Sequence, residues 1–204
     1  MKYIIAGIGT EIGKTLISSI LTETLQADYW KPIQSGALDF TDTDTVKSLI
    51  SNSKTVFHQE TYRLNQPMSP HAAAAIDGVE IELSKFQFPE TNNHLIVELA
   101  GGIMVPLNDR ETNLDLIKKL NIPVILISKN YLGSINHTLL SAEVLRMNGI
   151  EVKGLIFNGI ENKSSEDFIL NHTKLVCLGR VNYEEVISKN VVKSYADQFT
   201  NNLQ

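Results

Sequence analysis

One short segment near the amino terminus carries the residue types that bind phosphate. Residues 7–15 read GIGTEIGKT and follow the apolar run Tyr3–Ala6. Glycines let successive backbone N–H groups turn inward, and the start of a following helix adds a partial positive charge. Lys14 can then reach the β- and γ-phosphates of a nucleotide, and the hydroxyl of Thr15 can ligate Mg²⁺. The segment therefore predicts a phosphate-binding loop in a protein that uses Mg-ATP.

The glycines of this segment depart from the usual spacing of such loops. The usual first glycine falls at the position that Ile8 holds here, whereas Gly7 lies one residue earlier. Either the loop carries one extra residue or it begins at Gly9. The residues of this segment that we expect to contact the nucleotide are Glu11, Ile12, Gly13, Lys14, Thr15 and Leu16.

A second segment supplies a carboxylate for the metal. The apolar run Leu95–Val97 ends at Glu98. Ligands collect beyond the carboxyl ends of the strands of an open parallel sheet, so we expect Glu98 beside the phosphate loop. Its oxygens are the hard ligands that Mg²⁺ prefers, although a strand-end carboxylate can also simply face water. The nucleotide is expected to contact this turn at Glu98, Leu99, Ala100 and Gly101.

Short apolar runs alternate with helical patterns along the chain. The runs predict strands covered on both faces, and they are Tyr3–Ala6, Leu95–Val97, Val124–Ile127 and Leu155–Phe157. Helical spacing occurs at Lys14–Leu25, Asn113–Leu120 and Ile135–Met147, and Pro70 and Gly78 delimit a further short helix. This alternation predicts an α/β fold with a mostly parallel sheet and helices on both faces. We expect one domain over residues 1–204.

The composition argues against several classes of protein. A formal net charge of −5 disfavours a nucleic-acid partner, because phosphate contacts need a basic surface. No apolar run is long enough to span a membrane, and Gly7 interrupts the amino terminus too early for a secretion signal. The one cysteine, Cys177, has apolar neighbours that predict a buried thiol. We therefore expect a cytoplasmic protein.

Five segments in a constant order resemble those of ATP-dependent dethiobiotin synthetases over nearly the whole chain. They are the phosphate loop, residues 30–36 (WKPIQSG), residues 67–71 (PMSPH), residues 98–102 (ELAGG) followed by Pro106 and Leu107, and residues 132–137 (LGSINH). Five segments in order are more specific than any one of them. The resemblance implies a P-loop NTPase-like fold and a homodimer with its substrate near the subunit interface.

The resemblance also implies the reaction. A dethiobiotin synthetase carboxylates the vicinal diamine 7,8-diaminononanoate with CO₂ and ATP. A carbamate forms first, the γ-phosphoryl group moves to it as a carbamic-phosphoric anhydride, and the second amine closes the ring with loss of phosphate. Lysines and Mg²⁺ would stabilise the negative charge that develops in these steps.

Particular residues take roles by this resemblance. Lys14 would hold the phosphates, and Lys31 would stabilise the carbamate and the phosphorylated intermediate. Thr10 would donate its hydroxyl to the carbamate, and Ser35 would hydrogen-bond the diamine or the carbamate. The distal carboxylate of the substrate would lie at a helix start, where N–H groups are free. The residues of that helix start are Gly133, Ser134, Ile135 and Asn136.

Two further roles concern the metal and the base. Asp44 resembles a metal-binding aspartate and would join Thr15 and Glu98 around Mg²⁺. Asp42 is a close competitor, and either aspartate can instead cap the helix that follows. Asn158, after a late strand, resembles an asparagine that reads adenine, although Asn-Gly is also a strong turn dipeptide.

The chain departs from the family pattern at two positions, and one other class of protein competes. Gly9 stands where the family has an aspartate, whose role is then absent or supplied by Glu11, and Leu99 replaces a glycine. The alternative is an ATPase switch similar to ParA or MinD, whose fold is related. Those proteins carry a further lysine near the start of the loop, and none precedes Lys14 there.

Overall fold

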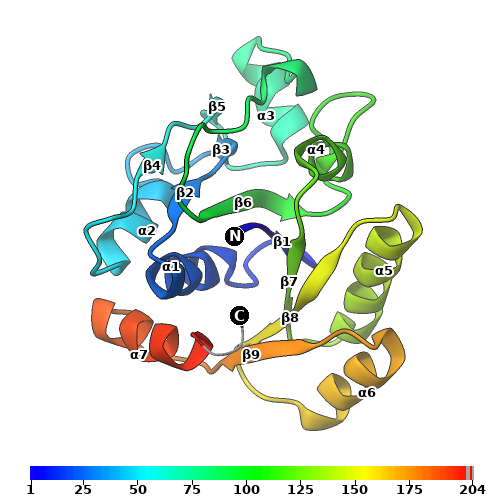
Figure 1. Ribbon diagram of the computed structural model, residues 1–204. Helices are drawn as coiled ribbons and strands as arrows, with labels where there is room; N and C mark the ends of the chain where they lie inside the picture. Colours follow the sequence, from blue (N-terminus) through cyan, green and yellow to red (C-terminus); the bar gives the residue numbers. More distant parts are fainter. Residues whose placement is uncertain (201–202, 204) are drawn as a thin grey trace.

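The computed structural model describes residues 1–200 and 203, and its centre is a seven-stranded sheet (Figure 1). The strands, in the order in which they lie side by side, are β4 (Phe57–His58), β2 (Asp28–Trp30), β6 (Leu95–Gly102), β1 (Lys2–Gly7), β7 (Val124–Lys129), β8 (Val152–Asn158) and β9 (Cys177–Val181). Neighbouring strands pair in parallel throughout. The predicted α/β fold with a parallel sheet is confirmed.

Helices cover both faces of this sheet, as Figure 1 shows. They are α1 (Lys14–Leu25), α2 (Asp42–Leu49), α3 (Pro70–Asp77), α4 (Asn113–Leu120), α5 (Ser134–Met147), α6 (Lys163–Thr173) and α7 (Lys189–Phe199), with a 3₁₀ turn, η1, at Leu83–Lys85. Side chains of α1, α2 and α7 form a core on one face, and those of α3, α4, α5 and α6 form a core on the other. Each central strand therefore contributes to both cores, which explains why its sequence is apolar throughout.

The helix ends follow local chemistry that the sequence contains. Pro70 occupies the first turn of α3, and Gly78 ends that helix with φ of 68°, a left-handed conformation that suits glycine. Helix α4 begins at a capping box in which Thr112 and Asp115 satisfy each other's backbone N–H groups. The predicted bounds of α1 and α4 match the structure at both ends.

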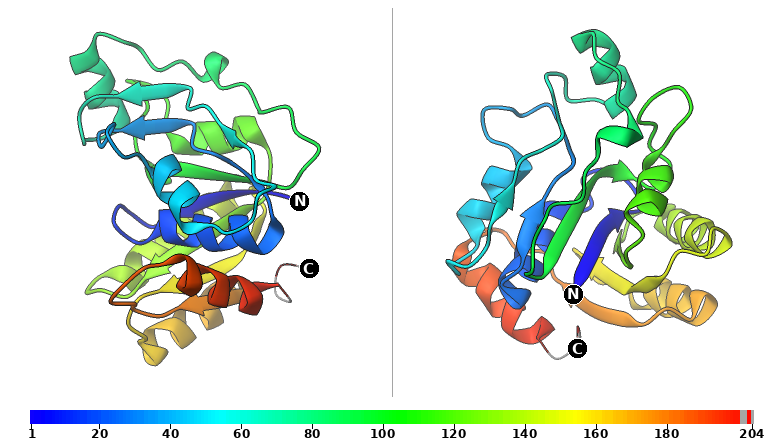
Figure 2. Two further views of the ribbon diagram at one scale, coloured as in Figure 1. Left: turned by 90° about the vertical axis from the view of Figure 1, so that its left-hand side faces the viewer. Right: turned by 45° about the horizontal axis from the view of Figure 1, so that its top comes forward.

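The chain between α1 and β6 forms a second, smaller sheet that the sequence did not predict. It pairs β3 (Ile33–Ser35) with β5 (Tyr62–Leu64) in parallel. Figure 2 shows this pair at the end of the molecule that carries α3, away from α7. At the end of this pair Gly36 lies so close to Pro67 that an added Cβ would be 2.6 Å from the proline Cα. This packing brings residues 34–35 and 67–70 to the wall of the cleft described below.

Two predictions from the sequence concern the burial of Cys177 and the presence of a membrane-spanning helix. The prediction of a buried thiol was wrong: Cys177 is exposed, because it begins β9 at the edge of the sheet, where Leu178 rather than Cys177 points into the core. Among the residues that the structure describes, no helix is both long and apolar enough to cross a membrane.

Candidate functional site

The loop between β1 and α1 closes around the side chain of its own lysine. Gly13 has φ of 91° and is followed directly by α1. The Nζ of Lys14 donates a hydrogen bond to the carbonyl oxygen of Gly9, at 2.8 Å. Gly7 still belongs to β1, where an added Cβ would lie 2.4 Å from the Cδ1 of Ile12. Gly7 therefore allows Ile12 to pack, and residues 8–13 make the turn.

The ends of two neighbouring strands hold this turn in place. The side-chain amide of Asn158, the last residue of β8, donates to the carbonyl oxygen of Ile12 at 2.8 Å. The Nζ of Lys129, the last residue of β7, donates to the carbonyl oxygen of Glu11 at 3.2 Å. An added Cβ on Gly13 would lie 2.1 Å from the amide nitrogen of Asn158. The backbone of the turn is thus fixed from the sheet before any ligand arrives.

A buried carboxylate lies next to the start of α1. Glu98 is 1% exposed, and its Oε1 accepts hydrogen bonds from the hydroxyl of Thr15 at 2.9 Å and from the Nζ of Lys31 at 3.0 Å. Lys31 also forms an ion pair with Asp42. The structure therefore brings the predicted residues Thr15 and Lys31 into direct contact with Glu98.

Charge and burial shift the pKa values of this group in opposite directions. Burial would raise the pKa of Glu98, but the ammonium of Lys31 outweighs it and holds that pKa below its usual range. Burial would lower the pKa of Lys31, but Glu98 and Asp42 raise it above its ordinary value. Lys14 differs, because burial lowers its pKa to about 8, with Glu98 opposing the shift. The two carboxylates therefore favour the charged form of Lys31, whereas Lys14 loses its charge as the pH rises through about 8.

These residues line one cleft of about 720 Å³. The predicted residues found on its walls are Thr10, Glu11, Gly13, Lys14, Thr15, Lys31, Ser35, Glu98, Ala100 and Gly101. The segment of residues 67–70 closes one side, and the hydroxyl of Ser35 fastens this segment through the carbonyl oxygens of Gln66 and Met68, at 2.9 and 2.8 Å. A cleft of this size, lined by cations and hydroxyls, suits a phosphate-bearing ligand together with a second small molecule.

Asp44, which was expected in the metal set, does not line this cleft. Its Oδ2 accepts from the hydroxyl and the backbone N–H of Thr41, at 2.7 and 2.9 Å, and so completes the capping box of α2. Asp42, the competing residue, lines the cleft and contacts Lys31. Asp42 and Asp44 are two residues apart in α2, so their side chains point in different directions.

Several other predicted residues lie outside the cleft walls. Ile12 and Leu99 are buried in the core, at 2% and 1% exposure, and Leu16 packs on the core of the α1 face. Asn158 holds the turn from behind. The helix start of residues 133–136 opens α5 and does not line this cleft.

Two residues that support the site were missed in the sequence. The hydroxyl of Tyr29 donates to the Oε2 of Glu98 at 2.9 Å. The amide of Asn113, at the start of α4, donates to the carbonyl oxygens of Ala100 and Gly102, at 2.6 and 2.8 Å, and fixes the end of β6 beyond Glu98. Tyr29 lies in β2, two residues before Lys31, which directly follows that strand, and this spacing was the available signal. Asn113 offers no such signal.

A phosphate loop at the carboxyl edge of a parallel sheet, with a buried carboxylate against its threonine, defines a P-loop nucleotide-binding protein. A family model described as an AAA domain matches residues 1–191. Two proteins named ATP-dependent dethiobiotin synthetase, from Cytophaga hutchinsonii and Christiangramia forsetii, are 52% and 50% identical to the chain over 202 residues, which is 97% or more of either chain in both comparisons. A protein of the same name from Chlamydia felis is 45% identical over 97% of this chain and 93% of its own length. The chain belongs to the ATP-dependent dethiobiotin synthetase family.

Solved structures with the same fold are much more distant in sequence. A putative plasmid partition protein from Borrelia burgdorferi bound to AMPPNP has a TM-score of 0.58 at 11% identity, over 99% of this chain and 96% of its own. The cell division ATPase MinD from Pyrococcus furiosus has a TM-score of 0.57 at 10% identity, over 98% of both chains. At such identities the likeness extends to the P-loop NTPase fold alone.

Proposed function

We propose that this chain is an ATP-dependent ligase that closes the ureido ring of dethiobiotin from 7,8-diaminononanoate and CO₂, with release of ADP and phosphate. The observation that supports it most directly is that Lys31, from the WKPIQSG segment, lies in one cleft with Lys14 of the phosphate loop. Relatives of this name match nearly the whole chain. The ParA-like or MinD-like alternative rests on the shared fold only, and the cytoplasmic location and the single domain over residues 1–204 stay predictions.

Each lysine has a separate part in the proposed reaction. Lys14, at the start of α1, would hold the β- and γ-phosphates together with the N–H groups of the turn. Lys31 is a cation held in place by Glu98 and Asp42, so it would stabilise the carbamate and the anhydride without reorganising. The hydroxyl of Thr10 reaches the same cleft and would donate to the carbamate. The proton of the Ser35 hydroxyl is engaged by Gln66 and Met68, so its oxygen would accept from an amine of the diamine.

The oxygen atoms around Glu98 fit Mg²⁺. The hydroxyl of Thr15 and the carboxylates of Glu98 and Asp42 are the hard donors that this ion prefers. Among the described residues no three acidic, imidazole or thiol side chains gather at one point, so the ion would also need oxygens from the nucleotide. Bound there, Mg²⁺ would neutralise charge on the phosphates. We propose Asp42 in place of Asp44 as the aspartate of this set.

The adenine base and the distal carboxylate of the diamine require binding groups that do not line the cleft. The side-chain amide of Asn158 is committed to Ile12, so its carbonyl oxygen would accept from the exocyclic amine of adenine. The helix start of residues 133–136 would bind the distal carboxylate of the diamine. Because these residues do not line the cleft of their own chain, we propose a homodimer in which a second copy presents them.

The test of this function is product formation. Purified protein supplied with Mg-ATP, bicarbonate and diaminononanoate is expected to release phosphate and form dethiobiotin, which mass spectrometry identifies. Phosphate release should depend on the diamine. ATP turnover that is indifferent to the diamine, with no dethiobiotin, would contradict the proposal.

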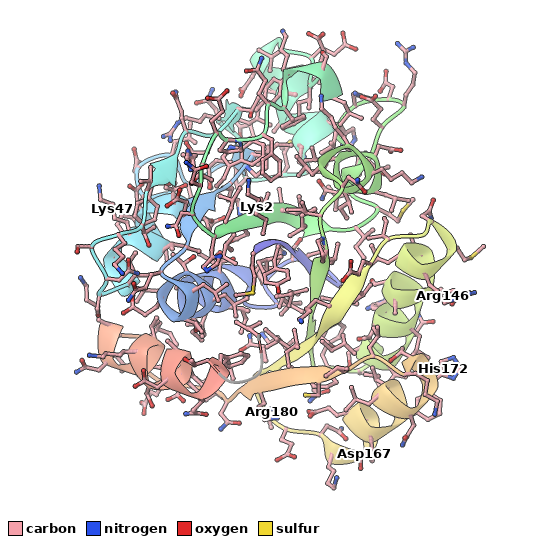
Figure 3. All side chains as sticks on the ribbon, viewed as in Figure 1. Lys2, Lys47, Arg146, Asp167, His172 and Arg180 are labelled. Carbon is pink, nitrogen blue, oxygen red and sulfur yellow. The ribbon has the colours of Figure 1, made fainter. Side chains whose placement is uncertain are left out.

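Two lysine variants connect this test to the site. Lys31→Ala is expected to abolish product and to lower the free energy of unfolding by about 3 kcal/mol, because two carboxylates lose their cation. Lys47→Ala is the control, since Lys47 is exposed on the outer side of α2 (Figure 3). Near-normal turnover in Lys31→Ala would refute the assigned role.

A further inference from the structure

The two oxygens of the Glu98 carboxylate have different partners. Oε1 accepts from Thr15 and Lys31, at 2.9 and 3.0 Å, and these two side chains line the cleft. Oε2 accepts from the hydroxyl of Tyr29, at 2.9 Å. Tyr29 is not part of the cleft wall and is 0% exposed. One oxygen thus faces the reactants and the other faces the core.

Strand geometry produces this arrangement. Strands β2 and β6 are neighbours and parallel, and Tyr29 lies opposite Ile96, two residues before Glu98. Because side chains alternate between the faces of a sheet, Ile96 and Glu98 share a face, and Tyr29 and Lys31 approach Glu98 from the same side. Trp30, between them, packs on the opposite core, where its Nε1 donates to the carbonyl oxygen of Gln59. A tyrosine and a lysine two positions apart therefore place one donor on each oxygen of the carboxylate.

The tyrosine is held rigidly and stays protonated. Its ring belongs to the core that α1 covers and lies 6.1 Å from the ring of Phe57, in a tilted arrangement. Burial, followed by the charges of Glu98 and Asp42, raises the pKa of Tyr29 well above its usual value. The hydroxyl is thus a fixed donor to Glu98.

We propose that Tyr29 is a positioning residue of the site: by occupying Oε2 of Glu98, it leaves Oε1 as the one oxygen that this carboxylate offers to Thr15, Lys31 and Mg²⁺. The terminal torsion of a glutamate is broad and roughly two-fold, so a free carboxylate can exchange its oxygens or turn both toward a cation. A hydrogen bond on Oε2 prevents both motions. This inference rests on the proposed function only for the identity of the metal and the nucleotide.

The test compares two buried tyrosines that belong to the same core. Tyr29→Phe removes the hydroxyl and keeps the ring. Tyr3→Phe is the matched control, because Tyr3 is 6% exposed and, among the described residues, its hydroxyl donates to the sulfur of Met1 rather than to a carboxylate. Calorimetry would measure the affinity for a non-hydrolysable ATP analogue with and without Mg²⁺. Tyr29→Phe is expected to weaken the Mg²⁺-dependent part of the affinity about tenfold and to leave Mg²⁺-free binding unchanged. Tyr3→Phe should change neither quantity.

A second variant shows whether Tyr29 acts through Glu98. In a Glu98→Gln background, Tyr29→Phe is expected to cause no further loss of Mg²⁺ dependence, because the two residues form one unit. An equal Mg²⁺ dependence in wild type and Tyr29→Phe, or the same loss in both backgrounds, would overturn the proposal. So would a crystal structure of the unaltered protein with Mg²⁺ and nucleotide in which both oxygens of Glu98 contact the ion. These measurements need no dethiobiotin, so their failure is distinguishable from failure of the proposed reaction.

Discussion

At the scale of single residues, Asp42 and Asp44 show how two identical side chains take different structural roles. Asp42 contacts Lys31 in the cleft, whereas Asp44 closes the capping box of α2. Hydrogen bonds from Thr41 lower the pKa of Asp44, as expected for a capping carboxylate. The sequence alone could not assign these two roles, because both aspartates lie in one short acidic segment. Which of them faces the cleft depends on the residue at which α2 begins.

The pair allows a matched prediction. Asp42→Asn is expected to raise the Mg²⁺ concentration needed for half-maximal turnover about tenfold, because it removes a charged oxygen from the proposed metal set. Asp44→Asn is expected to leave that requirement unchanged and to lower the free energy of unfolding by at most about 1 kcal/mol. Magnesium titrations of turnover and urea unfolding measure the two effects. The reverse pattern would restore Asp44 as the ligand.

The pKa of Lys14 predicts a pH dependence of nucleotide binding. Burial lowers this pKa to about 8, so the free protein loses the charge of Lys14 as the pH rises through that value. Phosphate binds the charged form, and the affinity for nucleotide should therefore fall above pH 8, by up to about tenfold per pH unit. Calorimetry between pH 7 and about pH 9.5 measures this affinity.

The contribution of Lys14 to the free energy of unfolding changes with pH in the opposite direction to the affinity for nucleotide. The folded pKa of Lys14 lies below its unfolded value of 10.5, so the unfolded chain binds more protons between about pH 8 and 10.5, and the contribution of Lys14 to stability rises with pH in that window. Lys14→Met is the control for binding: it should bind nucleotide more weakly and lack the change near pH 8. An affinity that is constant across the range in the unaltered protein would contradict the assignment.

At the scale of elements, the sequence predicts those strands whose two faces are both buried. β1 and β7 are apolar at nearly every position because helices cover both sides of the sheet there. β2 was missed since it has only three residues and Asp28 begins it, and β4 has only two. Their places depend on pairing with β6 and with each other. These are long-range contacts that no local pattern contains.

The difference between local sequence patterns and long-range strand pairing also decides which site residues could be predicted. The phosphate loop was predictable because it follows the buried strand β1 directly, and Glu98 because it follows the apolar run Leu95–Val97. The structure places Glu98 inside β6, which continues to Gly102. Tyr29 was not predicted, because its role depends on the register between β2 and β6. The thiol of Cys177 was assigned to the core from its apolar neighbours, but an edge strand buries only one of its faces.

The turn before α1 gives a prediction at this scale. Gly13→Ala is expected to displace Asn158 and break its hydrogen bond to Ile12, since the new Cβ would lie 2.1 Å from the amide nitrogen. Nucleotide affinity should fall at least about tenfold. Gly78→Ala is the control: Gly78 has a similar left-handed φ of 68°, but a Cβ there meets nothing within 4 Å.

Both variants carry the conformational cost of a left-handed alanine, which is about 1 kcal/mol. Thermal unfolding measures this shared cost, and calorimetric nucleotide binding separates the two variants. Equal nucleotide affinity in Gly13→Ala and Gly78→Ala would show that the contact with Asn158 does not hold the turn.

At the scale of the whole molecule, strand order explains why distant segments meet. β1 lies between β6 and β7, so the phosphate loop emerges beside Glu98 on one side and beside the Lys129 end of β7 on the other. β2 lies beyond β6 and brings Lys31 to the same edge. The small β3–β5 sheet then covers this edge with residues 67–70. A cleft built from five separated segments follows from one sheet order.

The helix start of residues 133–136 is a predicted substrate-binding segment that this order leaves outside the cleft, and the proposed dimer accounts for it. Leu132, directly before it, is fully exposed, so burying this side chain against a second copy would favour association.

We expect a dimer in sedimentation. Leu132→Asp should shift the protein toward monomer and raise the KM for the diamine several-fold, because the substrate carboxylate would lose its N–H groups. Ile160→Asp is the control, since Ile160 is also strongly exposed but lies after β8. A Leu132→Asp protein that remains a dimer with an unchanged KM would place the interface elsewhere, and a fully active wild-type monomer would remove the shared site altogether.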